Sequence, residues 1–141
     1  MIMLRYLLLP LLVLATFSAA AVEGAFTNVS ARNAQQIILS RTNSENFYLL
    51  DVRTDQEFAQ AHIQGAKQLD FYSATFSVDL EKLDRDKTYL LYCRTGMRSA
   101  RTFALMQQLG FHKVYNMRGG IVSWYQQRLP LVFKNINSET K

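Results

Sequence analysis

The stretch Lys87–Leu109, KTYLLYCRTGMRSARTFALMQQL, places an apolar run, a short basic loop and an amphipathic segment in direct succession. Residues 87–93 are mostly apolar from Tyr89 onward and follow a charged segment, which predicts a buried strand that ends at Cys93. Residues 97–109 have apolar side chains at helical spacing, and Gly110 is a typical helix stop. The residues expected to face the core from this helix are Ala100, Phe103, Ala104, Met106 and Leu109.

Strand and helix patterns alternate along the rest of the chain. Further helices are expected over residues 29–41, 54–61, 77–86 and 119–128, and further strands over 46–53, 66–71 and 113–117. The side chains expected inside are Val78, Leu80 and Leu83 from the third of these helices, and Trp124 and Tyr125 from the last. Strands joined by helices predict an α/β fold of three layers, with a mostly parallel central sheet and helices on both faces.

Two chemically useful side chains follow predicted strands. Cys93 ends one strand and Asp51 ends another. In open parallel sheets the functional crevice lies at the carboxyl ends of the strands. We therefore expect the site at this edge of the sheet.

Composition limits the classes of partner. The chain has 141 residues, enough for one domain, and a formal net charge of +5, which suits an anionic partner. It contains no run of lysines or arginines of the kind that forms a nucleic-acid-binding tail, so no nucleic acid is expected as partner. The two histidines and one cysteine are widely spaced and form no metal-site pattern.

The first 21 residues have the pattern of a secretory signal peptide. Arg5 precedes an apolar stretch that ends in small residues, and we expect cleavage after Ala20 or Ala21. The alternative is an uncut membrane anchor, but Pro10 interrupts the stretch, which is short for a span of about 20 residues. The expected mature protein is periplasmic and has no stable membrane association.

Cys93 is the only cysteine of the chain, so an internal disulfide is impossible. In an exported protein an unpaired cysteine indicates a reactive thiol or an intermolecular bond. The alternative is a buried and inert thiol that acts as a small apolar side chain. The residues around Cys93 must decide between these interpretations.

The loop after Cys93 favours a reactive thiol. Gly96 permits a turn with positive φ, so the backbone N–H groups can converge on one point, and the next helix directs its positive end there. Together with Arg94 and Arg98 they favour the thiolate, which is the nucleophilic form, and they attract an anionic substrate.

The spacing of the loop, Cys-x4-Arg, distinguishes it from that of the cysteine phosphatases, which have one more residue. At this point the sequence resembles the rhodanese-like domain family from about Phe26 to Val132. LLDVRTDQEFAQAHIQGAKQLDF, residues 49–71, is similar to the first signature of that family, and VYNMRGGIVSW, residues 114–124, to the last. One departure is Ala61, where the family typically has glycine.

The resemblance implies a three-layer rhodanese-like fold over residues 26–132, followed by a polar tail over 133–141. It implies a thiosulfate sulfurtransferase without cofactor or metal, in which Cys93 takes a sulfane sulfur as a persulfide and passes it to a thiol or cyanide. The residues implied for donor and persulfide binding are Arg94, Thr95, Gly96, Met97 and Arg98. Asp51 and Arg53 are implied to brace the site from behind.

Other interpretations remain open. A non-catalytic rhodanese-like binding module, a cysteine phosphatase-like enzyme and a thiol–disulfide redox protein all fit part of the pattern. His62 is expected to bond to backbone rather than act as a base, and Glu57 is expected to stabilise its helix. We expect a monomer whose partners are a small anionic sulfur donor and a thiol or cyanide acceptor.

Overall fold

A computed structural model describes residues 25–134. Its main feature is a parallel sheet of five strands in the order β1-β6-β5-β2-β4. These strands are β1 (Ala25–Val29), β6 (Lys113–Met117), β5 (Thr88–Tyr92), β2 (Phe47–Asp51) and β4 (Lys67–Gln68). Every pairing in this sheet is parallel, so all five strands end at the same edge. Within this sheet, β1 is the strand that the sequence patterns did not indicate, since they assigned residue 29 to the following helix.

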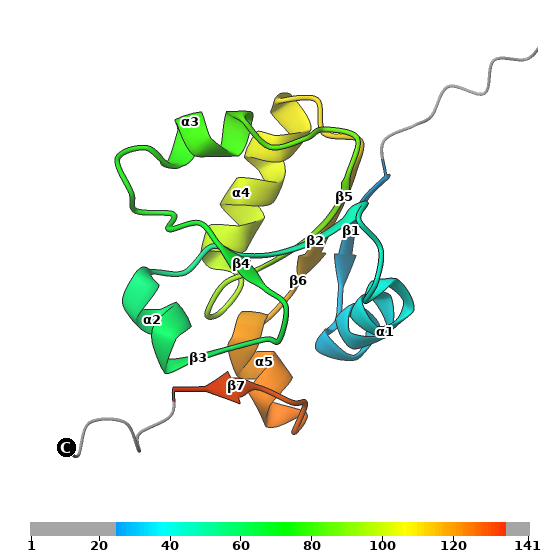
Figure 1. Ribbon diagram of the computed structural model, residues 1–141, viewed down its shortest axis with the longest axis vertical. Helices are drawn as coiled ribbons and strands as arrows, with labels where there is room; N and C mark the ends of the chain where they lie inside the picture. Colours follow the sequence, from blue (N-terminus) through cyan, green and yellow to red (C-terminus); the bar gives the residue numbers. More distant parts are fainter. Residues whose placement is uncertain (1–24, 135–141) are drawn as a thin grey trace, which may run out of the picture.

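Helices cover both faces of this sheet, as Figure 1 shows. The bounds are α1 (Ala31–Arg41), α2 (Asp55–Gln60), α3 (Phe76–Glu81), α4 (Met97–Gln108) and α5 (Gly120–Gln126). α1 and α5 share one hydrophobic cluster with the sheet, and α3 and α4 share the other. The predicted α/β fold of three layers with a parallel central sheet is confirmed.

A second, antiparallel pair of strands closes the end of the fold. β3 (Ala61–His62) pairs with β7 (Val132–Phe133), and the backbone N–H of Lys134 donates to the carbonyl of Gln60 at 3.0 Å. Phe133 is the first residue of the expected polar tail and here forms part of a strand. Two-residue strands have no periodicity, so no sequence pattern indicates this pair.

Side-chain caps explain where the first two helices begin. The Ser30 hydroxyl accepts a hydrogen bond from the N–H of Asn33 at 3.2 Å, as expected for an N-cap serine. At α2, the Thr54 hydroxyl accepts from the N–H of Glu57 while the Glu57 carboxylate accepts from the N–H of Thr54. This reciprocal pair is a capping box, and it fixes Glu57 at the carboxyl edge of the sheet.

Some of the expected core positions are wrong. Val78 is exposed, whereas the predicted burial of Leu80 is confirmed and Phe76 is buried as well. Tyr125 is exposed on α5, whereas Trp124 is buried. Residues two positions apart lie on opposite sides of a helix, so Val78 and Leu80 cannot both face the core, whereas Phe76 and Leu80 can.

The buried face of α4 is also more polar than predicted. Ala100 and Ala104 lie on the exposed side, while Ser99 and Thr102 are fully buried. Their hydroxyls donate to the carbonyls of Gly96 at 3.3 Å and Arg98 at 3.0 Å, within the same helix end. Since both polar side chains are hydrogen-bonded locally, their burial costs little.

Across residues 25–134, no helix is long and apolar enough to span a membrane. The predicted signal peptide over residues 1–21 lies outside the described residues.

Candidate functional site

Cys93 lies immediately beyond β5, at the centre of the carboxyl edge of the sheet. Its residue is only 1% exposed and it forms no disulfide. The N–H of Gly96 donates to the Cys93 sulfur at 3.1 Å. Gly96 has φ +105°, a conformation that side chains disfavour, so the glycine allows the loop to turn back on the thiol.

The environment of this thiol favours its ionised form. Burial raises the pKa of Cys93, but hydrogen bonds from the backbone N–H groups of Ser99, Gly96 and Thr95 and from the Ser99 hydroxyl outweigh burial. The Ser99 O–H donates to the sulfur when it turns away from the carbonyl of Gly96. The net effect lowers the pKa of the thiol below its ordinary value. The N–H and O–H dipoles that point at the sulfur therefore make this buried cysteine a better nucleophile at neutral pH.

The amino end of α5 holds the backbone of this loop from the other side. The N–H of Ile121 donates to the carbonyl of Cys93 at 2.8 Å, and that of Val122 to the carbonyl of Arg94 at 3.1 Å. Gly120 makes this close approach possible, because a Cβ there would overlap both carbonyl oxygens. With both carbonyls bound to α5, the loop N–H groups are free to face the sulfur.

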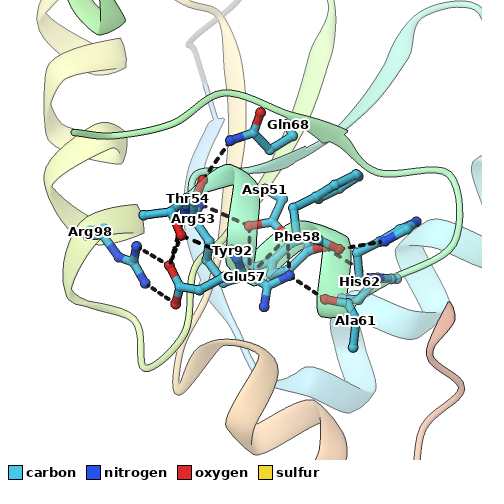
Figure 2. Close-up of polar contacts among 11 residues, drawn as sticks. Asp51, Arg53, Thr54, Glu57, Phe58, Ala61, His62, Gln68, Tyr92 and Arg98 are labelled. Carbon is cyan, nitrogen blue, oxygen red and sulfur yellow. Dashed lines mark hydrogen bonds and ion pairs between the residues drawn. The ribbon is translucent and has the colours of Figure 1, made fainter. Parts of the chain in front are cut away.

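Arg98, at the end of the loop, is held by Glu57 of α2. Its two terminal nitrogens donate to the two carboxylate oxygens of Glu57 at 2.7 and 2.8 Å, as Figure 2 shows. The hydrogen bonds from Arg98 lower the pKa of Glu57 to about 2, and Glu57 in turn raises the pKa of Arg98. The charge of Arg98 is therefore compensated in this state of the protein.

Asp51 and Arg53 form a buried pair behind the loop. Arg53 Nη2 lies 2.6 Å from Asp51 Oδ2, and the same nitrogen donates to the carbonyl of Ala61 at 2.7 Å (Figure 2). Burial and the Asp51 carboxylate both raise the pKa of Tyr92, whose hydroxyl accepts from the N–H of Ile63 at 3.2 Å. This network joins the ends of β2 and β5 to β3, so it fixes the base of the site.

The departure at Ala61 has no structural cost. Its backbone is extended, with φ −162° and ψ 142°, which any residue adopts. The nearby histidine behaves as expected: His62 Nδ1 lies 3.0 Å from the carbonyl of Phe58, and its ring stacks on the Phe58 ring.

The structure brings together the residues singled out in the sequence, with different degrees of exposure. Arg94, Thr95 and Met97 are exposed around the thiol, while Asp51 and Arg53 are buried beneath it. Within residues 25–134 no cluster of side chains could hold a metal ion.

Three contributors to the site were missed by the sequence reasoning. Ser99 supplies two hydrogen bonds to the thiol, and Glu57 pairs with Arg98. Gly120 leaves room for the carbonyl oxygens of the loop, because it has no Cβ. The Thr-x-x-Glu spacing did signal a cap at Glu57, but no local pattern shows that the carboxylate also reaches α4, 41 residues away.

One pocket of the described residues lies away from the Cys93 loop. It has a volume of about 440 Å³ and lies between α1, the start of β2 and Trp124. None of its lining residues belongs to the Cys93 loop.

Comparison with known protein families finds a match to the rhodanese-like domain over residues 34–127. A sulfurtransferase of Allochromatium vinosum is 36% identical over 90 residues, which cover 64% of this chain and 82% of that protein. A thiosulfate sulfurtransferase, GlpE, of Glaesserella parasuis is 28% identical over 109 residues, 77% of this chain and 95% of that one.

Solved structures show the same architecture. A rhodanese-related protein from Thermoplasma volcanium superimposes with a TM-score of 0.63 at 25% identity, over 76% of this chain and 98% of that one. A rhodanese-like domain protein from Staphylococcus aureus gives a TM-score of 0.59 at 26% identity, over 70% and 90% of the two chains.

Proposed function

The chain belongs to the rhodanese-like domain family, and on that premise we propose that it is a sulfurtransferase that carries sulfane sulfur as a persulfide on Cys93. The observation that carries the proposal is the N–H of Gly96 at 3.1 Å from the Cys93 sulfur, which together with donors of Thr95 and Ser99 surrounds a thiol of lowered pKa. A ring of this kind stabilises one negatively charged sulfur, whether thiolate or persulfide.

The proposed reaction has two displacements. The Cys93 thiolate attacks the outer sulfur of thiosulfate, a Cys93 S–S bond forms, the S–S bond of thiosulfate breaks, and sulfite leaves with the electron pair. Cyanide or a thiolate then attacks the outer sulfur of the persulfide, and Cys93 leaves as thiolate. Sulfur moves from donor to acceptor without any other oxidant, and the enzyme is a covalent carrier in between.

The exposed side of the loop is the proposed place for the donor. Arg94 forms no ion pair with any residue in 25–134, whereas Arg98 is paired with Glu57. We assign the first contact with the sulfonate group to Arg94. Thr95, Gly96, Met97 and Arg98 complete the rim around the sulfur.

Two-substrate kinetics test this proposal. With thiosulfate and cyanide varied together, a persulfide carrier predicts parallel lines in double-reciprocal plots. Lines that intersect would show that both substrates must be bound at once, which contradicts a covalent carrier. Aryl phosphate hydrolysis measured on the same preparation should be negligible, because the donors are arranged around a single sulfur.

We further propose that the protein is exported to the periplasm and acts there as a monomer on small sulfur compounds. The support is the pattern of residues 1–21, in which Arg5 precedes an apolar stretch and small residues. N-terminal sequencing of the protein from the periplasmic fraction should find a chain that begins near residue 21 or 22. An intact Met1 on a membrane-bound form would contradict export of a free domain.

A further inference from the structure

The carboxyl edge of the sheet divides into a basic and a mixed half, with Cys93 at the border. The segments that follow β1, β6 and β5 are residues 29–33, 117–123 and 93–101, and they contain five arginines and no carboxylate. The segments that follow β2 and β4, on the other side of Cys93, contain Asp55, Glu57 and Asp70.

The arginines of the basic half are available for a partner. Arg32, Arg94, Arg101 and Arg118 are exposed, and none of them forms an ion pair with another residue in the described part of the chain. Only Arg98, the fifth, is compensated, by Glu57. The basic half therefore carries four uncompensated positive charges beside the thiol.

Arg118 and Arg32 are connected to the loop by backbone contacts. The Arg118–Gly119 backbone lies against Gly96, so that a Cβ on Gly96 would stand 3.1 Å from the nitrogen of Gly119. The N–H of Arg118 donates to the carbonyl of Val29, the residue before the cap of α1, which carries Arg32 in its first turn. These contacts place the basic segments next to one another along the edge.

Large apolar side chains lie beside the same thiol. Met97 is 68% exposed at the start of α4, and Val122 is 37% exposed on α5, where its N–H bonds to the carbonyl of Arg94. Tyr72 is 69% exposed and lies over the guanidinium of Arg98 at 5.5 Å. Exposed apolar groups around a cationic centre are typical of a surface that binds another macromolecule.

A small dianion cannot use this surface. Neighbouring strands are about 4.8 Å apart, so the edge from β1 to β5 spans about 10 Å. Thiosulfate at the Cys93 loop can contact Arg94 but cannot reach the arginines beyond β6 and β1 at the same time. Thiosulfate also gains no binding energy from Met97 or Val122, because it has no apolar group that could cover them.

We infer that the physiological sulfur acceptor is a cysteine of an acidic protein, which docks on the basic half of the edge formed by Arg32, Arg94, Arg101 and Arg118. This inference rests on the proposed function. The acceptor thiolate attacks the outer sulfur of the Cys93 persulfide, the S–S bond within the persulfide breaks, and Cys93 leaves as thiolate. The acceptor cysteine becomes the persulfide. Acidic residues around it meet the arginines, and an apolar residue beside it covers Met97 and Val122.

Synthetic acceptors test the inference. The probes are three heptapeptides with a central cysteine flanked by glutamates, glutamines or lysines, and the small dicarboxylate thiol mercaptosuccinate. The persulfide is first loaded with thiosulfate and verified by intact mass, and its discharge is then timed. Rates are divided by each probe's thiolate fraction, since flanking charge shifts the pKa of the attacking thiol.

The expected result is a rate for the glutamate peptide about tenfold or more above that for the lysine peptide and above that for mercaptosuccinate, with the difference shrinking as salt is added. Reversal of one charge, in Arg32→Glu or in Arg118→Glu, should remove a large part of this preference. The matched control Arg41→Glu changes a charge at the opposite end of α1 and should preserve it.

The outcomes separate the two proposals. If no persulfide forms with thiosulfate, the proposed function fails before any acceptor is added. If the persulfide forms but the corrected rates of all three peptides are equal, or mercaptosuccinate matches the glutamate peptide, docking of an acidic protein is refuted. Equal effects of the Arg41→Glu and Arg32→Glu variants, which change the net charge by the same amount, would also refute it, because the effect would then come from net charge alone.

Discussion

The acidity of the Cys93 thiol depends on a few neutral donors more than on the arginines around it. Thr95, Gly96 and Ser99 donate to the sulfur, and together they outweigh the effect of burial on its pKa. Arg98, which on sequence is an obvious source of positive charge, has its guanidinium occupied by Glu57. At the scale of the residue, Ser99 therefore stabilises the Cys93 thiolate, a role that the sequence alone would assign to Arg98.

Replacement of Ser99 by alanine should raise the pKa of Cys93. The change removes the hydroxyl donor and leaves the backbone N–H in place. A hydrogen bond to a charged group contributes about 1.5–3 kcal/mol, which corresponds to a rise of about one to two pKa units. The measurement is the rate of alkylation by iodoacetamide as a function of pH.

The control for this variant is Ser123→Ala on α5, whose hydroxyl accepts from Gln127 and does not contact the thiol. Its alkylation profile should match that of the unchanged protein. An unshifted profile in Ser99→Ala would show that the Ser99 hydroxyl does not stabilise the thiolate.

At the scale of the element, the site depends on how α5 and α2 hold the loop between β5 and α4. Gly120 at the start of α5 lies against the carbonyls of Cys93 and Arg94. Glu57 of α2 holds Arg98 of α4 by a bidentate ion pair. Both contacts join elements that are distant in sequence, so each can be tested without touching Cys93.

Gly120→Ala should destabilise the fold and displace the loop. Its φ of +57° costs an alanine about 1–2 kcal/mol, and overlap of the new Cβ with two carbonyl oxygens adds further strain, for a total of about 3 kcal/mol or more. The free energy of unfolding in urea measures this loss, and slower alkylation of Cys93 reports the displaced loop.

The matched variant is Gly110→Ala at the end of α4. Gly110 also has positive φ, +79°, but a Cβ there would meet no atom within 4 Å. Its free energy of unfolding should fall only by the cost of positive φ in alanine, about 1–2 kcal/mol, and the reactivity of Cys93 should not change. Equal losses in the two variants would contradict the close approach assigned to Gly120.

Glu57→Gln isolates the ion pair with Arg98, because glutamine can still complete the capping box. The folded-state pKa of Glu57, about 2, is below its usual 4.5. The pair therefore stabilises the fold above pH 4.5, and this stabilisation is lost as the pH falls toward 2. After allowance for solvent screening at this partly exposed pair, we expect the variant to be about 1–2 kcal/mol less stable at pH 7.

Urea unfolding at pH 7 and at pH 2.5 checks the sign, since the difference between the two proteins should shrink at the lower pH. Asp55→Asn, an exposed acid-to-amide change on the same helix, should alter stability little at either pH. A difference for Glu57→Gln that is constant across the range would contradict a role for its charge.

The elements also show which parts of the fold could be read from the sequence. The strand–loop–helix unit of residues 87–109 is indicated by an apolar run, a glycine and a helical period, all of which are local. β3 and β7 are not, because two residues carry no period and their pairing is decided by tertiary contacts. The burial of Ser99 and Thr102 was missed for a related reason: local hydrogen bonds allow polar side chains on the buried face of α4.

At the scale of the whole molecule, the parallel sheet gathers the ends of five strands on one edge, and the candidate site lies there. The position of Cys93 and Asp51 on this edge follows from strand patterns alone, since the ends of parallel strands meet. The contact of Glu57 with Arg98 and of Gly120 with the loop could not be predicted in this way. Both depend on how helices from different parts of the chain pack, which the sequence pattern does not contain.

The persulfide on Cys93 is the central claim, and intact mass spectrometry tests it most directly. The purified protein is treated with thiosulfate, passed over a desalting column and weighed, and the modified peptide is mapped. We expect the chain to gain the mass of one sulfur atom on Cys93, to lose it again on addition of cyanide, and to gain nothing in Cys93→Ser. No gain in mass, or an equal gain in Cys93→Ser, would contradict the claim.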